Sequence, residues 1–467
     1  MEREAGDMAA RLDRIEWPDF GRPEVPAAAG LAEMRGRIAA LRAAMAARGL
    51  DRLVVYGDRE HAANIEWATG FDPRFEEALL ILGAEGAPVI VAGNECLPYT
   101  GIAPMVAAGE MRVRHCASLS LISQPRGGER LDAILAAEVG AGERVGTAGW
   151  KYWEEGEVDD PAGALEVPAL LADLLRGRAG RVENATDLFM HPGHGLRGRV
   201  DAAGIARLEF ANDMAARALR RMSFALREGM TDFACAEAAM LGGLPLGCHM
   251  TFATGDRAAQ GLSGPTGQVL RRGSPMSFNV CHWGANICRA GWVAEGPGDL
   301  PVAARDYLEA FVFPYVEAVA RWFGRLTPGT AGGAIWAQVM DDLPVGHFGV
   351  TLNPGHLIGT DEWISSPIFE GSEIPIASGM AMQCDIIPAH PVYGSTRMED
   401  GYVIAGPDLR RDLAARFPAV AARIARRRDF MAGVIGIALP EAVLPLADTC
   451  GIVAPWMLAP DQVVVLG

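Results

Sequence analysis

The chain has 467 residues, of which 50% are hydrophobic and 21% are charged, and its formal net charge at pH 7 is −16. This length is sufficient for two or three domains with substantial cores, and the composition excludes an intrinsically disordered chain. The negative charge repels nucleic-acid phosphates and anionic membranes, so we expect neither as a partner. We interpret the arginines between Arg423 and Arg428 as the solvated end of a C-terminal helix.

The chain begins with acidic and basic residues instead of a basic segment followed by an apolar one, which predicts no secretory signal. No apolar run approaches the roughly 20 residues of a membrane-spanning helix. The eight cysteines occur without C-x-x-C spacing, which favours free thiols over a structural zinc site. These features predict a cytoplasmic protein.

The first third of the chain has the pattern of an α/β domain. Residues 1–33 are rich in Pro and Ala and are predicted to be an irregular leader. Gly49 ends a predicted helix, and residues 53–56, 78–83 and 88–92 read as buried strands. The helix is predicted from apolar residues at helical spacing, namely Met34, Ile38, Leu41 and Met45.

The turn-forming segment from His191 to Gly198 predicts a domain boundary near residues 190–200, with His191 and His194 as loop residues. The expected division is residues 34–192 for the first domain, 193–435 for the second and 436–467 for a C-terminal extension.

The second domain shows one pattern twice. A helix predicted over residues 205–226 precedes a turn, and Thr231 or Asp232 is expected to cap a helix over 234–240. The same order of two helices separated by a turn recurs later in the chain, with helices predicted over residues 303–323 and 334–340. The repeat is one of pattern only.

Three short segments near the C-terminal end carry acid and imidazole side chains: His356 in N-P-G-H-L-I-G, Asp385 in G-M-A-M-Q-C-D and Glu399 in T-R-M-E-D-G. Together they resemble the second half of the creatinase, aminopeptidase P and prolidase family (peptidase family M24). Residues 64–78, with a T-G-F turn, resemble the N-terminal domain of the same family. The resemblance implies an α/β (α+β) protein with a creatinase-like N-terminal domain, a C-terminal pita-bread domain and a homodimeric assembly.

In that family two Asp, one His and two Glu residues bind a pair of divalent metals. Asn279 and Asn286 stand here where the Asp residues are expected, and Asp385 replaces the first Glu. Two carboxylates neutralise one divalent cation, so a full dinuclear site is not expected. One alternative is a single zinc, manganese or iron ion on His356, Asp385 and Glu399.

The other alternative is no metal, with Asp385 and Glu399 as an acid/base pair, and creatinase is a metal-free relative. A third is that these residues are structural remnants of a dead site. Cys281, His282 and Cys288 lie in the altered hairpin and could replace lost ligands, although strand alternation sends Cys281 and His282 to opposite faces.

The family's proton-transfer histidines are also missing. The position ahead of the first Asp strand falls at Leu262 or Ser263, and the second His position is Trp363. His249 lies too far upstream to be in register and is interpreted as a core or surface residue. Without both imidazoles, cleavage of Xaa-Pro peptides loses its usual proton relay.

Asp361-Glu362-Trp363 resembles a stretch in the pita-bread enzymes that cleave dimethylsulfoniopropionate, and the resemblance makes Asp361 the predicted base. In the structural alternative, Asp361 or Glu362 caps a turn and Trp363 packs against the cleft wall.

Two guanidinium groups, those of Arg289 and Arg397, are candidates to bind a substrate carboxylate, together with Trp363. Each arginine could equally pair with Asp385 or Asp400.

The resulting hypothesis is a hydrolase that cleaves a C–N bond (amide, amidine or Xaa-Pro-like) in a small, polar, carboxylated molecule. Its predicted catalytic residues are His356, Asp361 and Glu399, with Asp361 or a metal-bound water as base or nucleophile. Lyase chemistry initiated by Asp361 is the first alternative. A non-catalytic protein that binds a small molecule is the second.

Overall fold

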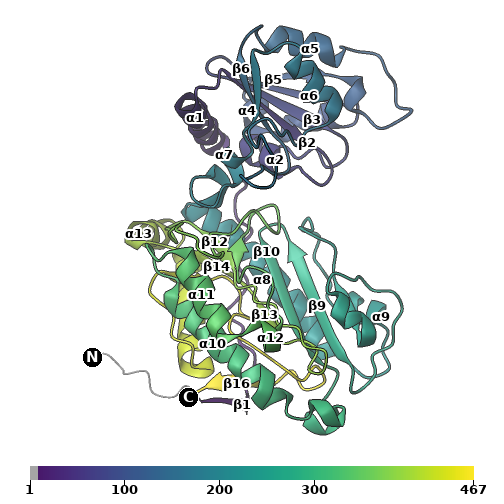
Figure 1. The fold of residues 1–467 in the computed structure, drawn as a ribbon, viewed down its shortest axis with the longest axis vertical. Coiled ribbons are helices and arrows are strands. Elements are labelled where there is room, and N and C mark those ends of the chain that lie inside the picture. The colour runs from purple at the N-terminus through teal and green to yellow at the C-terminus, as the bar shows by residue number, and fades with distance from the viewer. Residues whose placement is uncertain (1–8) are drawn as a thin grey trace. The chain divides into compact units, whose positions relative to one another are not determined.

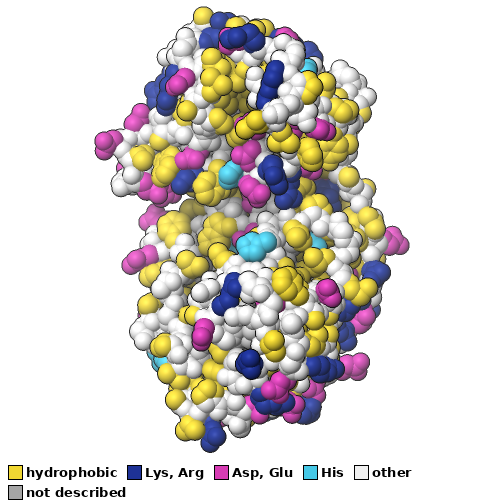
Figure 2. Space-filling model, turned by 90° about the vertical axis from the view of Figure 1, so that its right-hand side faces the viewer, with side chains coloured by type: hydrophobic (Ala, Val, Ile, Leu, Met, Phe, Trp, Pro, Cys, Tyr) yellow, Lys and Arg dark blue, Asp and Glu magenta, His cyan; other side chains and the backbone are white. Residues whose placement is uncertain are grey.

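The computed structural model describes residues 9–467 (Figure 1). They form two compact units, one of residues 27–197 and the other of Gly198–Gly467 together with the described residues up to Pro26. Within the described residues, none of the helices has the length and apolarity that crossing a membrane requires. On the face drawn in Figure 2, acidic and basic side chains are interspersed with apolar ones.

The unit of residues 27–197 is built around one mixed sheet. Helix α1 (Leu31–Arg48) buries the four apolar residues that its spacing predicts, and Gly49 ends it in the left-handed region at φ +70°. The predicted strands are confirmed as β2 (Arg52–Gly57), β3 (Ala78–Gly83) and β4 (Val89–Ala92).

The sheet order is β5-β4-β3-β2-β6-β7. Its other strands are β5 (Arg112–His115), β6 (Arg144–Ala148) and β7 (Arg181–Asn184). Strands β2 and β3 are buried along almost their whole length, which explains their continuous apolar sequence. The remaining helices of the unit include α2 (Ala63–Thr69), α3 (Cys96–Tyr99), α4 (Pro104–Ala107), α5 (Leu131–Glu138), α6 (Ala169–Arg176) and α7 (Asp187–Met190).

The second unit repeats one arrangement. Its first half consists of α8 (Ala202–Ala225), α9 (Asp232–Glu237) and strands β8 (Phe252–Thr254), β9 (Pro275–His282) and β10 (Ala285–Trp292). Its second half consists of α10 (Phe313–Arg325), α11 (Gly332–Asp342) and strands β11 (His356–Leu357), β12 (Ala381–Gln383), β13 (Arg397–Glu399) and β14 (Gly401–Ile404).

Each half turns between its helices in the same way. Leu226 is the C-cap of α8 and Leu326 that of α10, and the glycine three residues after each cap has φ +86° at Gly229 and +97° at Gly329. The N–H of each glycine donates to a later strand-like segment, to Leu270 O and Ile376 O respectively. The structure therefore shows the repeat that the sequence indicated only as a pattern.

Several predicted elements differ in detail. The hydroxyl of Thr231 accepts from the N–H of Ala234, as expected of a cap, but α9 ends at Glu237 instead of continuing to residue 240. The helix predicted over residues 303–323 is a short 3-10 turn, a π-helical segment (Leu308–Val312) and then α10. The unit also contains three further helices that are labelled in Figure 1 or discussed below, namely α12 (Val345–Phe348), α13 (Pro407–Arg416) and α14 (Pro418–Phe430).

The predicted irregular leader is wrong for residues 10–14. They form β1 (Ala10–Arg14), which pairs antiparallel with β16 (Gln462–Leu466), so the two ends of the described chain share a two-stranded sheet. The segment expected to be a C-terminal extension belongs to the same compact unit as β1. The structure divides the chain after Arg197, where the sequence suggested residue 192.

Two four-stranded sheets frame the candidate site. Their orders are β13-β10-β9-β8 and β11-β12-β14-β15, where β15 is Val443–Pro445. Asp400 alone separates β13 from β14, so the chain passes directly from one sheet to the other. The Nε2 of Gln383 in β12 donates to the carbonyl of Asn286 in β10 at 2.6 Å, which links the sheets again.

The arginines near residue 425 are not all solvated. Arg423 and Arg427 on α14 are 8% and 1% exposed, and both donate to the carboxylate of Glu209 on α8, which is fully buried. Arg427 also donates to Asp448 at 2.7 Å. The prediction of a solvated face is therefore wrong for these two residues, because spacing of four places both on the same buried side of the helix.

The substitution Glu209→Ala is expected to reduce the free energy of unfolding by about 3–5 kcal/mol, because it leaves two buried guanidinium groups without their shared carboxylate. The matched control is Asp412→Ala, which removes an exposed partner of Arg416 and is expected to cost less than about 1 kcal/mol. Urea unfolding followed by tryptophan fluorescence measures both. Equal losses for the two variants would contradict the assignment.

Candidate active site

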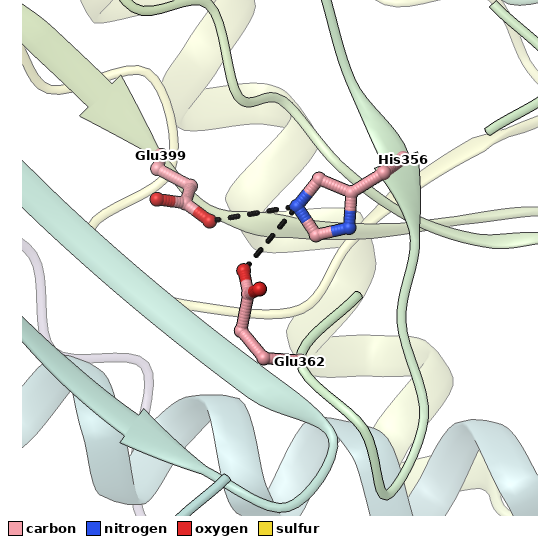
Figure 3. A group of neighbouring side chains, drawn as sticks. All are labelled: His356, Glu362 and Glu399. Atoms are coloured by element: carbon pink, nitrogen blue, oxygen red, sulfur yellow. Dashed lines mark ion pairs between the residues drawn. The ribbon is translucent and has the colours of Figure 1, made fainter. Parts of the chain in front are cut away.

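The candidate active site is centred on His356, which is fully buried in the short strand β11. Its Nε2 lies 3.3 Å from Oε1 of Glu362, 3.9 Å from Oε1 of Glu399 and 4.0 Å from Oδ2 of Asp385. Figure 3 shows Glu362 and Glu399 approaching the same ring nitrogen from different segments of the chain. One imidazole therefore faces three carboxylates.

Glu362 belongs to this group because the chain folds back directly after β11. The N–H of Leu357 donates to Ser365 O at 2.7 Å, and the N–H of Ile364 returns to Leu357 O at 3.0 Å. This tight excursion brings Glu362 back to His356. The D-E-W stretch marks this segment in the sequence, but the residue predicted from it was Asp361 and not the neighbouring Glu362.

The compact donor group consists of His356, Glu362 and Glu399, whose ligand atoms all lie within 4.8 Å of one another. The set predicted from sequence was His356, Asp385 and Glu399, so Glu362 takes the place expected of Asp385. Asp385 remains beside the group, with its Oδ1 buried and without a hydrogen-bond partner among the described residues. The sequence predicted two carboxylates around His356, and the structure places three there.

Two asparagines occupy the hairpin that faces this group. Strands β9 and β10 are joined by a two-residue turn with Gly284 at φ +83°, and Asn279 lies opposite Cys288 while Asn286 lies opposite Cys281. Their side chains are hydrogen-bonded, Asn279 Nδ2 to Asn286 Oδ1 at 3.1 Å. The short hairpin therefore does bring Asn279 and Asn286 together at the site.

The amides form a directed chain of hydrogen bonds. The backbone N–H of Thr251 donates to Asn279 Oδ1 at 2.7 Å, and Asn286 Nδ2 donates to Glu399 Oε1 at 3.0 Å and to Glu362 Oε1 at 3.2 Å. Burial raises the pKa of Glu362 but the hydrogen bond to His356 outweighs it, so Glu362 is an ionised acceptor and the Asn286 amide turns its nitrogen towards it. An uncharged donor thus bridges the two glutamates.

The crowding of carboxylates determines the ionisation of the group. Burial lowers the pKa of His356, but Glu362, Glu399 and Asp385 outweigh it and raise that pKa to about 10. Burial and then the charge of Asp385 raise the pKa of Glu399 to about 8. Without a cation, His356 is therefore an imidazolium at neutral pH and Glu399 retains a proton.

Trp363 stacks on His356, with ring centroids 4.2 Å apart and an angle of 19° between the planes. The indole is 38% exposed while the imidazole is fully buried, so Trp363 both fixes the imidazole and forms part of the accessible surface. Asp361 precedes Glu362 in the same excursion and is not among the carboxylates that pair with His356.

Arg289 is not positioned to bind a substrate. It is 2% exposed, donates to Oδ2 of Asp400 at 2.8 Å, and also donates to the carbonyls of Cys288, Glu399 and Thr449. The prediction of a carboxylate anchor at this position is wrong because the guanidinium group is committed to Asp400. It fastens β10 to the junction of β13 and β14.

Arg397 remains a candidate anchor. It lies two residues before Glu399 in β13 and therefore on the same face of the strand. Its Nε is buried without a hydrogen-bond partner among the described residues, and the side chain lines a cavity of about 870 Å³ together with Asp256, Ser277 and His390.

The other sequence candidates lie outside the donor group. Cys281, His282 and Cys288 are not part of the donor group found among the described residues, which gives no support to their replacing a lost ligand. His282 is fully buried, and burial raises the pKa of the Cys288 thiol to about 12. The exposed His249 contacts the carbonyl of Leu262 at 2.8 Å. His191 and His194 stack on one another in the turn-rich segment of the other unit, as loop residues.

Restoring both carboxylates tests the role of the asparagines. The double variant Asn279→Asp/Asn286→Asp is expected to unfold more easily in chelator, by about 2 kcal/mol or more, because five carboxylates then repel one another. Mn²⁺ is expected to reverse the loss and to bind with higher stoichiometry than in the parent protein. Thermal unfolding with and without Mn²⁺, and elemental analysis, measure these effects.

The control for this variant is Asn94→Asp, which makes one such amide-to-carboxylate change in the other compact unit. It is expected to leave the metal response unchanged. Parental stability in chelator together with parental metal content in the double variant would contradict the described geometry.

Comparison with known proteins agrees with this architecture. Residues 37–149 match the family model of the Creatinase/Prolidase N-terminal domain. The search of curated proteins gives no match.

Several solved structures are similar over most of their length. The prolidase from Pyrococcus horikoshii OT3 has a TM-score of 0.62 and 14% identity, covering 79% of this chain and 95% of that chain. The dipeptidase PepE from Mycobacterium ulcerans has a TM-score of 0.56 and 21% identity, covering 82% and 95%. The aminopeptidase PepP from Pseudomonas aeruginosa has a TM-score of 0.56 and 17% identity, covering 84% and 99%.

Residues 37–149 therefore match a creatinase/prolidase N-terminal domain, and the chain has the fold of these prolidase, dipeptidase and aminopeptidase structures. The predicted family resemblance and the predicted α/β fold class are confirmed.

Proposed function

We propose that this protein is a hydrolase that cleaves a C–N bond in a small, polar, carboxylated molecule, with one divalent metal ion bound by His356, Glu362 and Glu399. The observation that carries the proposal is the buried group in which one imidazole nitrogen faces three carboxylates. Such a concentration of negative charge is costly to bury unless a cation or protons compensate it.

The donor set suits one ion of zinc, manganese or iron. These metals bind imidazole nitrogen and carboxylate oxygen at about 2.0–2.2 Å, so neighbouring ligand atoms lie about 3–3.5 Å apart. The 3.3 Å from His356 to Glu362 already meets this requirement, and the 3.9 Å to Glu399 needs a small approach. Among the described residues, the printed partners of His356 Nε2 are the three carboxylates themselves, so this nitrogen becomes a metal ligand once the ring gives up its proton.

A bound divalent ion would polarise a substrate carbonyl and make a water molecule more acidic. The protein's own groups supply the rest. Trp363 holds the imidazole in place, and Asn286 fixes the two glutamates. The side chain of Glu362 is 25% exposed, which gives solvent and small molecules access from its side.

Proton transfer and substrate orientation are assigned to further side chains. Glu399 and Asp385 are buried carboxyl groups that can hold and release a proton. Asp361 is the proposed base, and Arg397 is the proposed partner of the substrate carboxylate.

Two features argue against assigning the activities of the structurally similar enzymes to this chain. An Xaa-Pro dipeptidase and an X-Pro aminopeptidase are among the similar structures. Here, however, uncharged asparagines face the glutamates, and Trp363 stands where the family resemblance places a second histidine. Both changes favour a different small substrate over a conventional Xaa-Pro peptide.

Metal content tests the site directly. Protein purified without chelator is expected to carry about one equivalent of zinc, manganese or iron. Glu362→Ala and Glu399→Ala are expected to lose both the metal and the rise in thermal stability that Mn²⁺ gives. Asp408→Ala, which changes an exposed carboxylate, is the control. Elemental analysis that gives two tightly bound ions, or none after incubation with each metal, would reject the single-ion model.

Turnover tests the reaction. The metal-loaded protein is offered a panel of N-acyl amino acids, amidino acids and Xaa-Pro dipeptides, and released amines are measured by mass spectrometry. Glu362→Ala is expected to lower kcat/KM by about 10²-fold or more, and Arg397→Met to raise KM most for carboxylated substrates. An eliminated alkene as product would favour the lyase alternative, and binding without turnover would favour a non-catalytic protein.

A further inference from the structure

Two cysteine thiols lie close together beside the candidate active site. Cys281 is in β9 and is 1% exposed, whereas Cys248 lies in the loop before β8 and is partly exposed. The interaction between the two thiols is the largest influence on the pKa of each, lowering that of Cys248 and raising that of Cys281. One partly exposed sulfur therefore lies beside one protected sulfur.

The backbone holds this pair together. Leu246 forms an isolated bridge with His282, and the N–H of Gly247 donates to the carbonyl of Cys281 at 3.3 Å. The absence of a side chain at Gly247 permits the approach, since a Cβ there would lie 2.8 Å from the Cys281 sulfur. The contact is thus built into the pairing of the loop with the end of β9.

The pair is also connected to the asparagine chain. Asn279 Nδ2 contacts the sulfur of Cys248 at 3.5 Å while it donates to Asn286, and Thr251 fixes Asn279 from the other side. Three successive hydrogen bonds, through Asn279 and Asn286, therefore connect Cys248 to Glu362 and Glu399. A change at its sulfur reaches the groups that orient the two glutamates.

We propose that Cys248 and Cys281 form a redox-active dithiol that closes to a disulfide by exchange with a low-molecular-mass disulfide such as oxidised glutathione. The remaining six cysteines are buried, so Cys248 is the thiol that an external disulfide reaches first. The formation of the disulfide does not depend on the proposed function, whereas its coupling to metal affinity rests on the proposed metal site.

The exchange proceeds in two balanced steps. The Cys248 thiolate attacks one sulfur of the external disulfide, whose S–S bond breaks, and one thiol leaves with the proton that Cys248 gave up. Cys281 then loses its proton and attacks the Cys248 sulfur, which releases the second thiol. Two cysteine thiols are oxidised by two electrons, and one external disulfide is reduced to two thiols.

The full-length protein is equilibrated with mixtures of reduced and oxidised glutathione, quenched with acid and an alkylating reagent, and mapped by mass spectrometry. The expected product is a peptide pair joined through Cys248 and Cys281, formed before any other cysteine reacts and reversed by dithiothreitol. Cys281→Ser is expected to stop at a glutathione adduct on Cys248, and Cys248→Ser to leave Cys281 reduced. The control, Cys235→Ser, is expected to form the cross-link as the parent does.

The parent protein decides the result even if a variant fails to fold. A stable glutathione adduct on Cys248 without the cross-link overturns the proposal, and so does a protein in which both thiols stay reduced until buried cysteines react. Coupling to the site is measured by Mn²⁺ titration of the oxidised and reduced forms, which are expected to differ at least about threefold in affinity because the Asn279 contact to sulfur is altered.

Discussion

The buried negative charge around His356 is the constraint on which the rest of the second unit depends. Three carboxylates, those of Glu362, Asp385 and Glu399, converge on one ring nitrogen, and the latter two side chains are 9% and 2% exposed. Three carboxylates cannot all remain ionised there without compensation. A protonated His356, the guanidinium group of Arg397, a proton on Glu399, the amide of Asn286 and a bound cation can each supply part of it.

This charge explains why the surrounding frame is so rigidly tied. Arg289 donates to the carboxylate of Asp400, the residue between β13 and β14, and Thr449 donates to the same carboxylate at 2.7 Å. Gln383 ties β12 to β10. These bonds hold the two sheets at the spacing that lets Glu399 and His356 meet. The polar frame thereby fixes positions that apolar packing alone would leave adjustable.

Much of this architecture can be read from the sequence. Helix α1 and strands β2 and β3 follow directly from apolar periodicity, and His356 and Glu399 are found from their short motifs. Glu362 is not, because its place in the group results from a backbone excursion between Leu357 and Ser365 that no periodicity marks. Arg289 and Arg397 look equivalent in sequence, and only burial against Asp400 separates them. The burial of Arg427 likewise requires its partner Glu209, which lies more than two hundred residues away.

The asparagine pair is more than a remnant of lost ligands. An amide that replaced a carboxylate by chance would leave donors or acceptors unsatisfied in a buried site, at a cost of about 1–3 kcal/mol each. Instead the chain from Thr251 through Asn279 and Asn286 to Glu362 and Glu399 satisfies donors and acceptors in one consistent direction. The Asn286 amide donates two N–H hydrogen bonds to the glutamates, whereas a second cation would supply them with positive charge. The hairpin is therefore complementary to a site with fewer positive charges, and the chemistry of this chain is expected to differ from that of proteins whose fold it shares.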